Sequence, residues 1–101
     1  MIARIWHGYT KPQNADAYAD LLRTKILPGI HRVGGYKGAC LLRRRRAVEV
    51  EFVTLTFWES MDAVAEFAGA ESSHAVVPEE ARRLLERFDE RSEHYEAEWL
   101  A

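Results

Sequence analysis

The pattern of residues at the start of the chain predicts a β-strand over residues 2–9, because the sequence IARIWHGY is rich in β-forming residues. Arg4 and Trp6 fall on one face of this strand, and His7 and Tyr9 fall on the other. A shift of one residue in strand register would exchange Trp6 and His7 between the two faces. The pattern therefore predicts the strand but leaves open which of these two residues faces the interior.

Helical spacing replaces alternation from residue 14 to residue 26. The apolar stripe at i, i+3, i+4 and i+8 consists of Tyr18, Leu21, Leu22 and Ile26. Pro28 and Gly29 are expected to interrupt or end this helix, with a further turn as far as His31, and Gly34-Gly35 marks a clear break.

The rest of the chain predicts a hairpin, two helices and a last strand. The segments are a strand over residues 36–43, a turn over 44–47, a strand over 48–58, a helix that Ser60 caps, a short helix over 79–86, and a strand over 90–98. The polarity of the last segment favours an edge strand.

The resulting order, β-α-β-β-α-β with an extra short helix before the last strand, is the ferredoxin-like pattern of the α+β class. It predicts a single domain, residues 1–101, with four antiparallel strands and helices on one face of the sheet. The other face needs a cover, and the sheet of a second copy is the simplest one. We therefore expect a homodimer whose two sheets form a dimeric α/β barrel.

Composition narrows the function. The formal net charge of -2 and the pI near 6.1 argue against a nucleic-acid partner, because phosphate contacts need a basic surface. Cys40 is the single cysteine, so no internal disulfide can form. No stretch approaches the roughly 20 apolar residues of a membrane span, and the N-terminal residues do not follow the pattern of a signal peptide. We expect a cytoplasmic protein with no membrane association.

Four segments together resemble the antibiotic biosynthesis monooxygenase (ABM) family of dimeric α/β-barrel proteins. They are IARIWHGYT, ILPGIHRVGGYKGACLLRR, VEFVTLTFWESMDAVAEFAG and RSEHYEAEW, and the stretch TLTFWESMDAVAEFAG is the most specific. The resemblance implies a homodimer with a cavity between sheet and helices in each subunit. Some members of the family are cofactor-free monooxygenases of polycyclic aromatic quinols or anthrones, and others degrade haem with an Asn, a Trp and a His.

The haem-degrading pattern transfers poorly to this chain. His7 stands where the asparagine is expected, and Phe67 falls near the position of the catalytic tryptophan. The histidine that follows this tryptophan could be His74, but it comes a few residues too early in the sequence. Trp58 matches a strand-end aromatic residue of the wider family instead. The resemblance thus favours the cofactor-free branch.

The topology predicts where chemistry can take place, because the first and last strands of a ferredoxin-like sheet are antiparallel neighbours. This brings the region of Trp6 and His7 near His94, and the third strand brings Trp58 from the other side. We expect His94 or His7 to act as the base, because the pKa of histidine lies near neutrality. Arg4 is expected to stabilise an oxyanion. The expected walls of the cavity are Trp6, Tyr9, Trp58 and Phe67. His74 is a further candidate for binding the substrate.

Three functions are compatible with these residues. The first is a monooxygenase that oxidises an aromatic, quinol-like molecule with dioxygen and needs no cofactor. The second is a small-molecule-binding accessory protein without turnover, and the third is a haem-binding or haem-degrading protein. The four histidines are far apart in sequence and show no metal-ligand spacing, so no metal site is expected.

Overall fold

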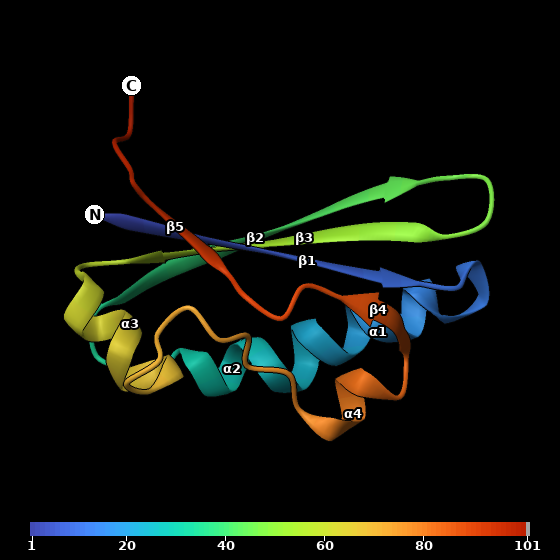
Figure 1. The fold of residues 1–101 in the computed structure, drawn as a ribbon, viewed down its shortest axis with the longest axis horizontal. Helices are drawn as coiled ribbons and strands as arrows, with labels where there is room; N and C mark the ends of the chain where they lie inside the picture. Colours follow the sequence, from blue (N-terminus) through green and yellow to red (C-terminus); the bar gives the residue numbers. More distant parts are fainter. Residues whose placement is uncertain (101) are drawn as a thin grey trace.

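The computed structural model describes residues 1–100 and shows two layers, with one antiparallel sheet above and all helices below it (Figure 1). Strand β1 (Ile2–Thr10) lies in the middle of the sheet, next to β3 (Val50–Trp58), and β2 (Tyr36–Arg45) lies outside β3. On its other side β1 pairs with two short strands in succession, β4 (Leu85–Phe88) and β5 (Glu93–Glu96). The ferredoxin-like α+β fold that the sequence predicted is confirmed.

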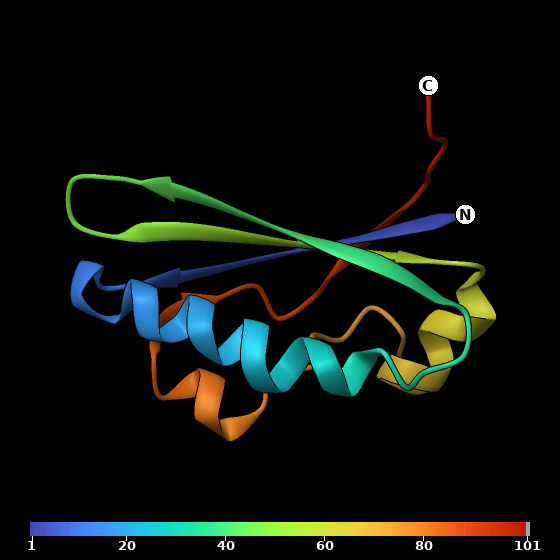
Figure 2. The ribbon, with the colours of Figure 1, turned by 180° about the vertical axis from the view of Figure 1, so that it is seen from behind.

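The helical layer consists mainly of one long run that crosses the sheet (Figure 2). It begins as a 3₁₀ turn at Pro12–Asn14, continues as α1 (Ala15–Leu21), widens into a π-helical segment (Leu22–Ile26) and ends as α2 (Leu27–Ile30). Pro28 therefore does not end the helix. Its ring would clash with the carbonyl of Thr24 in a regular α-helix, and the wider π turn directly before it relieves that contact.

Two short helices complete this layer. Helix α3 (Met61–Ala68) begins after Ser60, whose side chain accepts a hydrogen bond from the Ala63 backbone N–H, as the sequence predicted. Helix α4 (Glu79–Arg82) ends four residues before the predicted helix end at residue 86. The chain then pairs with β1 as strand β4, because hydrogen bonding to the sheet outweighs the local helical spacing.

The last strand is also shorter than the predicted span of residues 90–98. Only Glu93–Glu96 pair with β1, opposite Ile2–Ile5, and the chain leaves the sheet after them. This strand is at an edge, as its polarity predicted. The extra strand arises because β4 and β5 divide one edge of β1 between them, so the sheet has five strands where four were expected.

The register shows which side chains face the helices. Arg4 pairs with Thr56 and Trp6 with Thr54, and these four share the face that the helices cover. Two apolar clusters hold the layers together. One centres on the buried Tyr18 and Phe52 at the β4 end, and the other on the fully buried Trp58 at the α3 end. The helices and strands thus leave a space between the two clusters, directly below the middle of β1.

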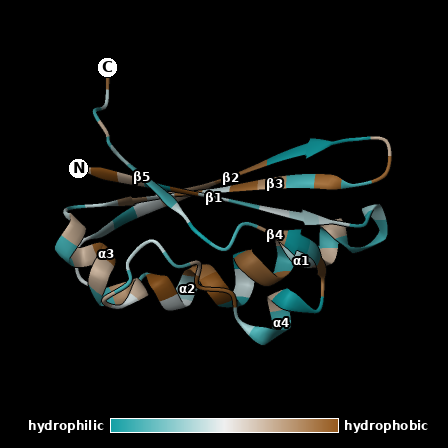
Figure 3. Ribbon diagram, viewed as in Figure 1, coloured by the Kyte–Doolittle hydropathy of each residue, from teal (hydrophilic) through white to brown (hydrophobic). Residues whose placement is uncertain are grey.

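The opposite face of the sheet has no helix over it (Figure 1). Apolar segments run along its strands, above all β3 (Figure 3). From the register, the apolar side chains on this outer face are Ala3, Ile5, Leu42, Val53, Leu55 and Phe57. None of the helices among residues 1–100 is long and apolar enough to cross a membrane.

Candidate binding and active site

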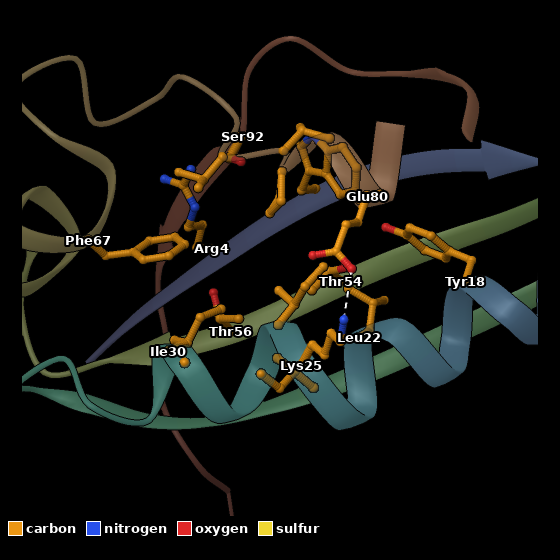
Figure 4. Close-up of a pocket in the computed structure, with 18 residues that line it drawn as sticks. Arg4, Tyr18, Leu22, Lys25, Ile30, Thr54, Thr56, Phe67, Glu80 and Ser92 are labelled. Carbon is orange, nitrogen blue, oxygen red and sulfur yellow. Dashed lines mark hydrogen bonds and ion pairs between the residues drawn. The ribbon is translucent and has the colours of Figure 1, made fainter. Parts of the chain in front are cut away.

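A cavity of about 370 Å³ lies between β1 and β3 on one side and the long helical run on the other (Figure 4). Most of its wall is apolar. Leu22, Ile26 and Ile30 reach it from the helices, and Val77 reaches it from the segment before α4. The volume falls within the range of small-molecule sites, which are mostly apolar with a few polar groups.

Arg4 is the principal charged group in this wall. It projects from the middle of β1, lines the cavity, and is only 4% exposed. Its Nη1 donates to the carbonyl of Ser72 at 2.5 Å and its Nη2 to the carbonyl of His74 at 2.8 Å. The guanidinium also lies over the ring of Phe67, 5.6 Å from the ring centre. Burial lowers the pKa of Arg4, but a guanidinium stays protonated at neutral pH.

His94 stands directly opposite Arg4 in the β1–β5 pair, and its Nε2 lies 2.9 Å from Nη1 of Arg4. Because a guanidinium has donors only, Nε2 must be the acceptor, and the ring is neutral with its proton on Nδ1. Burial, and then the charge of Arg4, lower the pKa of His94. The imidazole therefore holds Arg4 in place from behind and does not itself line the cavity.

Neutral polar groups line the far part of the cavity. Tyr18 is 1% exposed, and burial raises the pKa of its hydroxyl, which lies beside Thr54 (Figure 4). The Thr54 hydroxyl oxygen has no hydrogen-bond partner among the described residues. Thr56, by contrast, accepts a hydrogen bond from the Trp58 indole at 2.8 Å.

Trp6 forms an aromatic side wall. Its indole N–H donates to the carbonyl of Asp89 at 2.7 Å. A Cβ atom placed on Gly8 would lie 3.0 Å from two indole carbons, so the ring lies closely over this glycine. The missing side chain at Gly8 gives Trp6 the room to lie along the strand.

An ion pair spans the rim. Nζ of Lys25, in the π-helical segment, lies 3.1 Å from Oε2 of Glu80 in α4, and both residues line the cavity (Figure 4). Both side chains are more than half exposed, so the pair contributes little to stability. It joins two elements that are far apart in sequence across one side of the cavity.

A strap over residues 71–78 closes the remaining side. Arg4 binds two of its carbonyls, and backbone hydrogen bonds join Ser92 to Ser73 and Ala75 to Glu90. The strap thus depends on Arg4 for part of its position.

The structure separates the predicted site residues into two groups. Arg4, Trp6 and Phe67 line the cavity, and His94 contacts Arg4. Trp58 is fully buried behind Phe67, with the two rings stacked 5.2 Å apart.

The other predicted residues lie away from the cavity. His7 and Tyr9 are on the outer face of β1, where Nδ1 of His7 lies 3.3 Å from Oδ2 of Asp89 and the Arg87 guanidinium covers the Tyr9 ring at 3.7 Å. The side chain of His74 is exposed, and this residue reaches the site through its carbonyl.

Sequence reasoning missed several lining residues. Tyr18 and Leu22 belong to the helical stripe that was interpreted as core, and their position in that stripe was the available signal. No sequence pattern indicated Lys25, Glu80 or Ser92, because only the fold brings these residues to the same cavity.

Comparison with known proteins shows which family this chain resembles. The model of the family described as antibiotic biosynthesis monooxygenase matches residues 1–79. Comparison with curated protein sequences gives no significant match.

Solved structures share the fold over most of the chain. A Bacillus cereus protein described as an antibiotic biosynthesis monooxygenase has 15% identity and a TM-score of 0.67, covering 99% of this chain and 97% of that one. The haem degrader MhuD from Mycobacterium tuberculosis, with two haems in its active site, has 19% identity and a TM-score of 0.61, covering 100% and 99%. A Streptomyces coelicolor monooxygenase in complex with nanaomycin D has 20% identity and a TM-score of 0.55, covering 68% and 61%. At these identities the likeness concerns the fold.

Proposed function

Because this chain belongs to the antibiotic biosynthesis monooxygenase family, we propose that it oxidises an aromatic, quinol-like small molecule with dioxygen and without a cofactor. One observation carries the proposal. A largely apolar cavity of about 370 Å³ contains a buried guanidinium, Arg4, that faces no carboxylate partner among residues 1–100. Such a site can hold a flat aromatic ring and stabilise negative charge on its oxygen.

The chemistry needs an electron-rich anion, because triplet dioxygen reacts slowly with closed-shell molecules. The ionised substrate passes one electron to dioxygen, and the resulting radical and superoxide combine to form a hydroperoxide. For a ring CH₂ group, loss of water then leaves a carbonyl, so that CH₂ and O₂ become C=O and H₂O. Dioxygen supplies the full oxidation, and no external reductant is consumed.

In this proposal Arg4 binds the ionised oxygen and His94 positions Arg4. It holds the guanidinium in the resting site through the 2.9 Å contact of Nε2 with Nη1. The substrate would bind as its anion on the free Nε and Nη2 donors of Arg4, because Nε2 of His94 contacts Arg4 and does not line the cavity. Trp6 and Phe67 would hold the ring flat and exclude water. His7 and Tyr9 have no part in this step.

We also propose that the protein is a homodimer joined through the outer face of the sheet. The observation that supports it is the set of apolar side chains on β1, β2 and β3 that no helix covers. Two such faces packed together would form a β-barrel core with the two cavities on the outside.

The second candidate is a binding protein without turnover. It is favoured by one observation, namely that the only imidazole next to the cavity among residues 1–100 is already engaged by Arg4. In that case the cavity would hold an aromatic ligand and release it unchanged.

Oxygen uptake tests the proposal. Purified protein is mixed with anthrone, whose ring CH₂ group would become a carbonyl, and dioxygen consumption above the uncatalysed rate and formation of anthraquinone are followed with and without EDTA. We expect EDTA-insensitive uptake that Arg4→Gln abolishes and that Arg32→Gln, a change of an exposed arginine, leaves intact. Uptake equal to the protein-free rate, with the ligand recovered unchanged, would favour the binding protein. A Soret shift on addition of haem would instead favour the haem-binding function.

A further inference from the structure

We propose that the cavity selects ligands that are already anionic at neutral pH, namely aromatic acids whose carboxylate or ionised phenol binds Arg4. This inference rests on the proposed function for its site and deepens it by naming the substrate class. It does not depend on turnover, so the two can fail separately.

The hydrogen bonds of Arg4 leave part of its guanidinium free. Of its five N–H donors, three are used, two on Nη1 and one on Nη2, by Ser72, His94 and His74. Nε and the second hydrogen of Nη2 have no protein acceptor among the described residues. Nε and Nη2 flank one edge of the guanidinium, and this edge can receive both oxygens of a carboxylate.

The three protein partners of Arg4 are all neutral. Two are backbone carbonyls and the third is an unprotonated imidazole, so the buried positive charge has no counter-ion. Burying a charge without an opposite charge costs several kcal/mol. Carbonyl groups also accept hydrogen bonds from neutral donors, so the hydrogen bonds alone do not explain a guanidinium at this position.

The charges that line the cavity are unbalanced in the same direction. Arg4 and Lys25 are cations, and Glu80 is the only carboxylate in the wall among residues 1–100. Glu80 is paired with Lys25 at the rim, which leaves Arg4 as the unmatched charge. An anion would therefore be attracted into the cavity, whereas a cation would meet an uncompensated positive charge.

The remaining wall determines the rest of the ligand. Phe67 lies against the guanidinium, and Trp6 and the helix residues form apolar surfaces on the other sides. A ligand that fits would be a small aromatic ring system with its acid group at one end. The acid would lie on Arg4, and the ring would extend toward Tyr18 and Thr54.

Calorimetric titration with four non-oxidisable probes tests this inference. 2-Naphthoate and 2-naphthamide have the same shape but differ in charge. 1-Nitro-2-naphthol is ionised near neutral pH, whereas 2-naphthol is not. We expect 2-naphthoate to bind at least tenfold more tightly than 2-naphthamide. A similar preference for the nitronaphthol over 2-naphthol would identify an ionised phenol as an equivalent ligand, and its absence would restrict the class to carboxylates.

Variants connect the preference to Arg4. In Arg4→Gln, which removes the charge but keeps a polar side chain, the preference for 2-naphthoate should fall to within twofold, with 2-naphthamide nearly unaffected. Arg4→Lys should retain part of the preference, because it keeps the charge without the planar fork. Arg32→Gln should behave as the wild type. Circular dichroism and thermal unfolding identify any variant that fails to fold.

Three results would overturn the inference. The first is equal binding of acid and amide to the wild-type protein, and the second is no binding of either acid. The third is a preference that survives in folded Arg4→Gln. If the preference holds while oxygen uptake is absent, the anion site stands and the monooxygenase proposal fails. If uptake occurs without a charge preference, the monooxygenase proposal stands and the anion site fails.

Discussion

The two faces of strand β1 lie in different surroundings although their residues alternate along nine positions. On the inner face, Arg4 and Trp6 border a cavity whose volume suits a small molecule. On the outer face, Ile5 and His7 belong to a broad, open surface. Neighbouring residues on one strand thus have different surroundings, and we propose that one face binds a ligand and the other a second copy of the chain.

The charges on the two faces differ as well. Arg4, inside, has only neutral partners among residues 1–100, whereas Glu51, the buried charge of the outer face, is matched. Glu51 is 6% exposed and accepts from Arg44 and Arg46, and Arg44 is the first cause of its lowered pKa. Charges with an opposite partner are typical of a surface that is stable in solvent or packed against a second copy of the chain. An unmatched charge is typical of a site whose partner arrives from outside.

The largest expected effect is on formation of the proposed dimer, when a charge is placed on the outer face. Leu42→Glu places a carboxylate on the outer face, where Leu42 is 47% exposed in the single chain, so folding should be retained. Burying that charge between two sheets costs several kcal/mol, so we expect dimer dissociation constants to rise on the order of a hundredfold or more. Analytical ultracentrifugation measures this.

The matched control is Val48→Glu at the hairpin tip, where Val48 is 80% exposed. This variant should dimerise as the wild type does. A Leu42→Glu protein that remains fully dimeric would show that the outer face is not the interface.

The second prediction exploits two adjacent residues. Trp6→Leu removes an aromatic wall of the cavity, and we expect the affinity for 2-naphthoate to fall about tenfold, the size of effect that one lost aromatic contact gives. His7→Leu, on the opposite face, should change this affinity less than twofold. Calorimetry measures both, and equal losses would contradict the separation of the two faces.

This pair of residues also shows the limit of sequence reasoning. The order of elements, the capped helix α3 and the position of β1 between β3 and the last strands could be predicted, because they depend on local spacing and general topology. Which of Trp6 and His7 faces the cavity could not be predicted. Both faces of β1 carry bulky residues, and alternation alone does not show which face is inside. Only the pairing with Thr54, below which the helices pack, decides it.

Tertiary contacts likewise decided what local patterns could not. Ala81, Leu84, Leu85 and Phe88 have helical spacing, yet Leu85–Phe88 pair with β1 as a strand. Arg4 was expected to stabilise an oxyanion, but its dependence on the carbonyls of Ser72 and His74 joins positions some 70 residues apart. Such contacts have no local signature.

The third prediction concerns pH and the inner face alone. The pKa of His94 is lowered from 6.5 in the folded protein, so the unfolded chain binds more protons below that value. The contribution of His94 to stability is therefore complete above pH 6.5 and is lost as the pH falls through the lower folded pKa. Thermal unfolding between pH 7 and pH 5 should show a smaller loss of stability for His94→Gln than for the wild type.

The exposed His31 offers the control, since His31→Gln should follow the wild-type pH dependence. The lowered pKa of Glu51 acts in a separate window, below its usual value of 4.5, and does not interfere. Identical pH profiles for His94→Gln and the wild type would show that the Arg4–His94 contact does not hold the imidazole neutral.

The smallest expected effect is at the rim, where inner and outer environments meet. Glu80→Gln removes the one carboxylate near the ligand path, so 2-naphthoate should bind about two- to threefold more tightly. Lys25→Gln leaves Glu80 unpaired and should weaken binding by a similar factor. These factors correspond to less than about 1 kcal/mol, as expected for exposed charges.

Salt distinguishes this rim effect from the binding at Arg4. At 0.5 M NaCl the differences between the two rim variants should disappear, because exposed charges are screened within a few ångströms. The preference for 2-naphthoate over 2-naphthamide should persist, because Arg4 is buried. If salt removed both effects together, the anion would be held at the exposed rim by Lys25, and the division between a matched surface and an unmatched interior would not explain ligand choice.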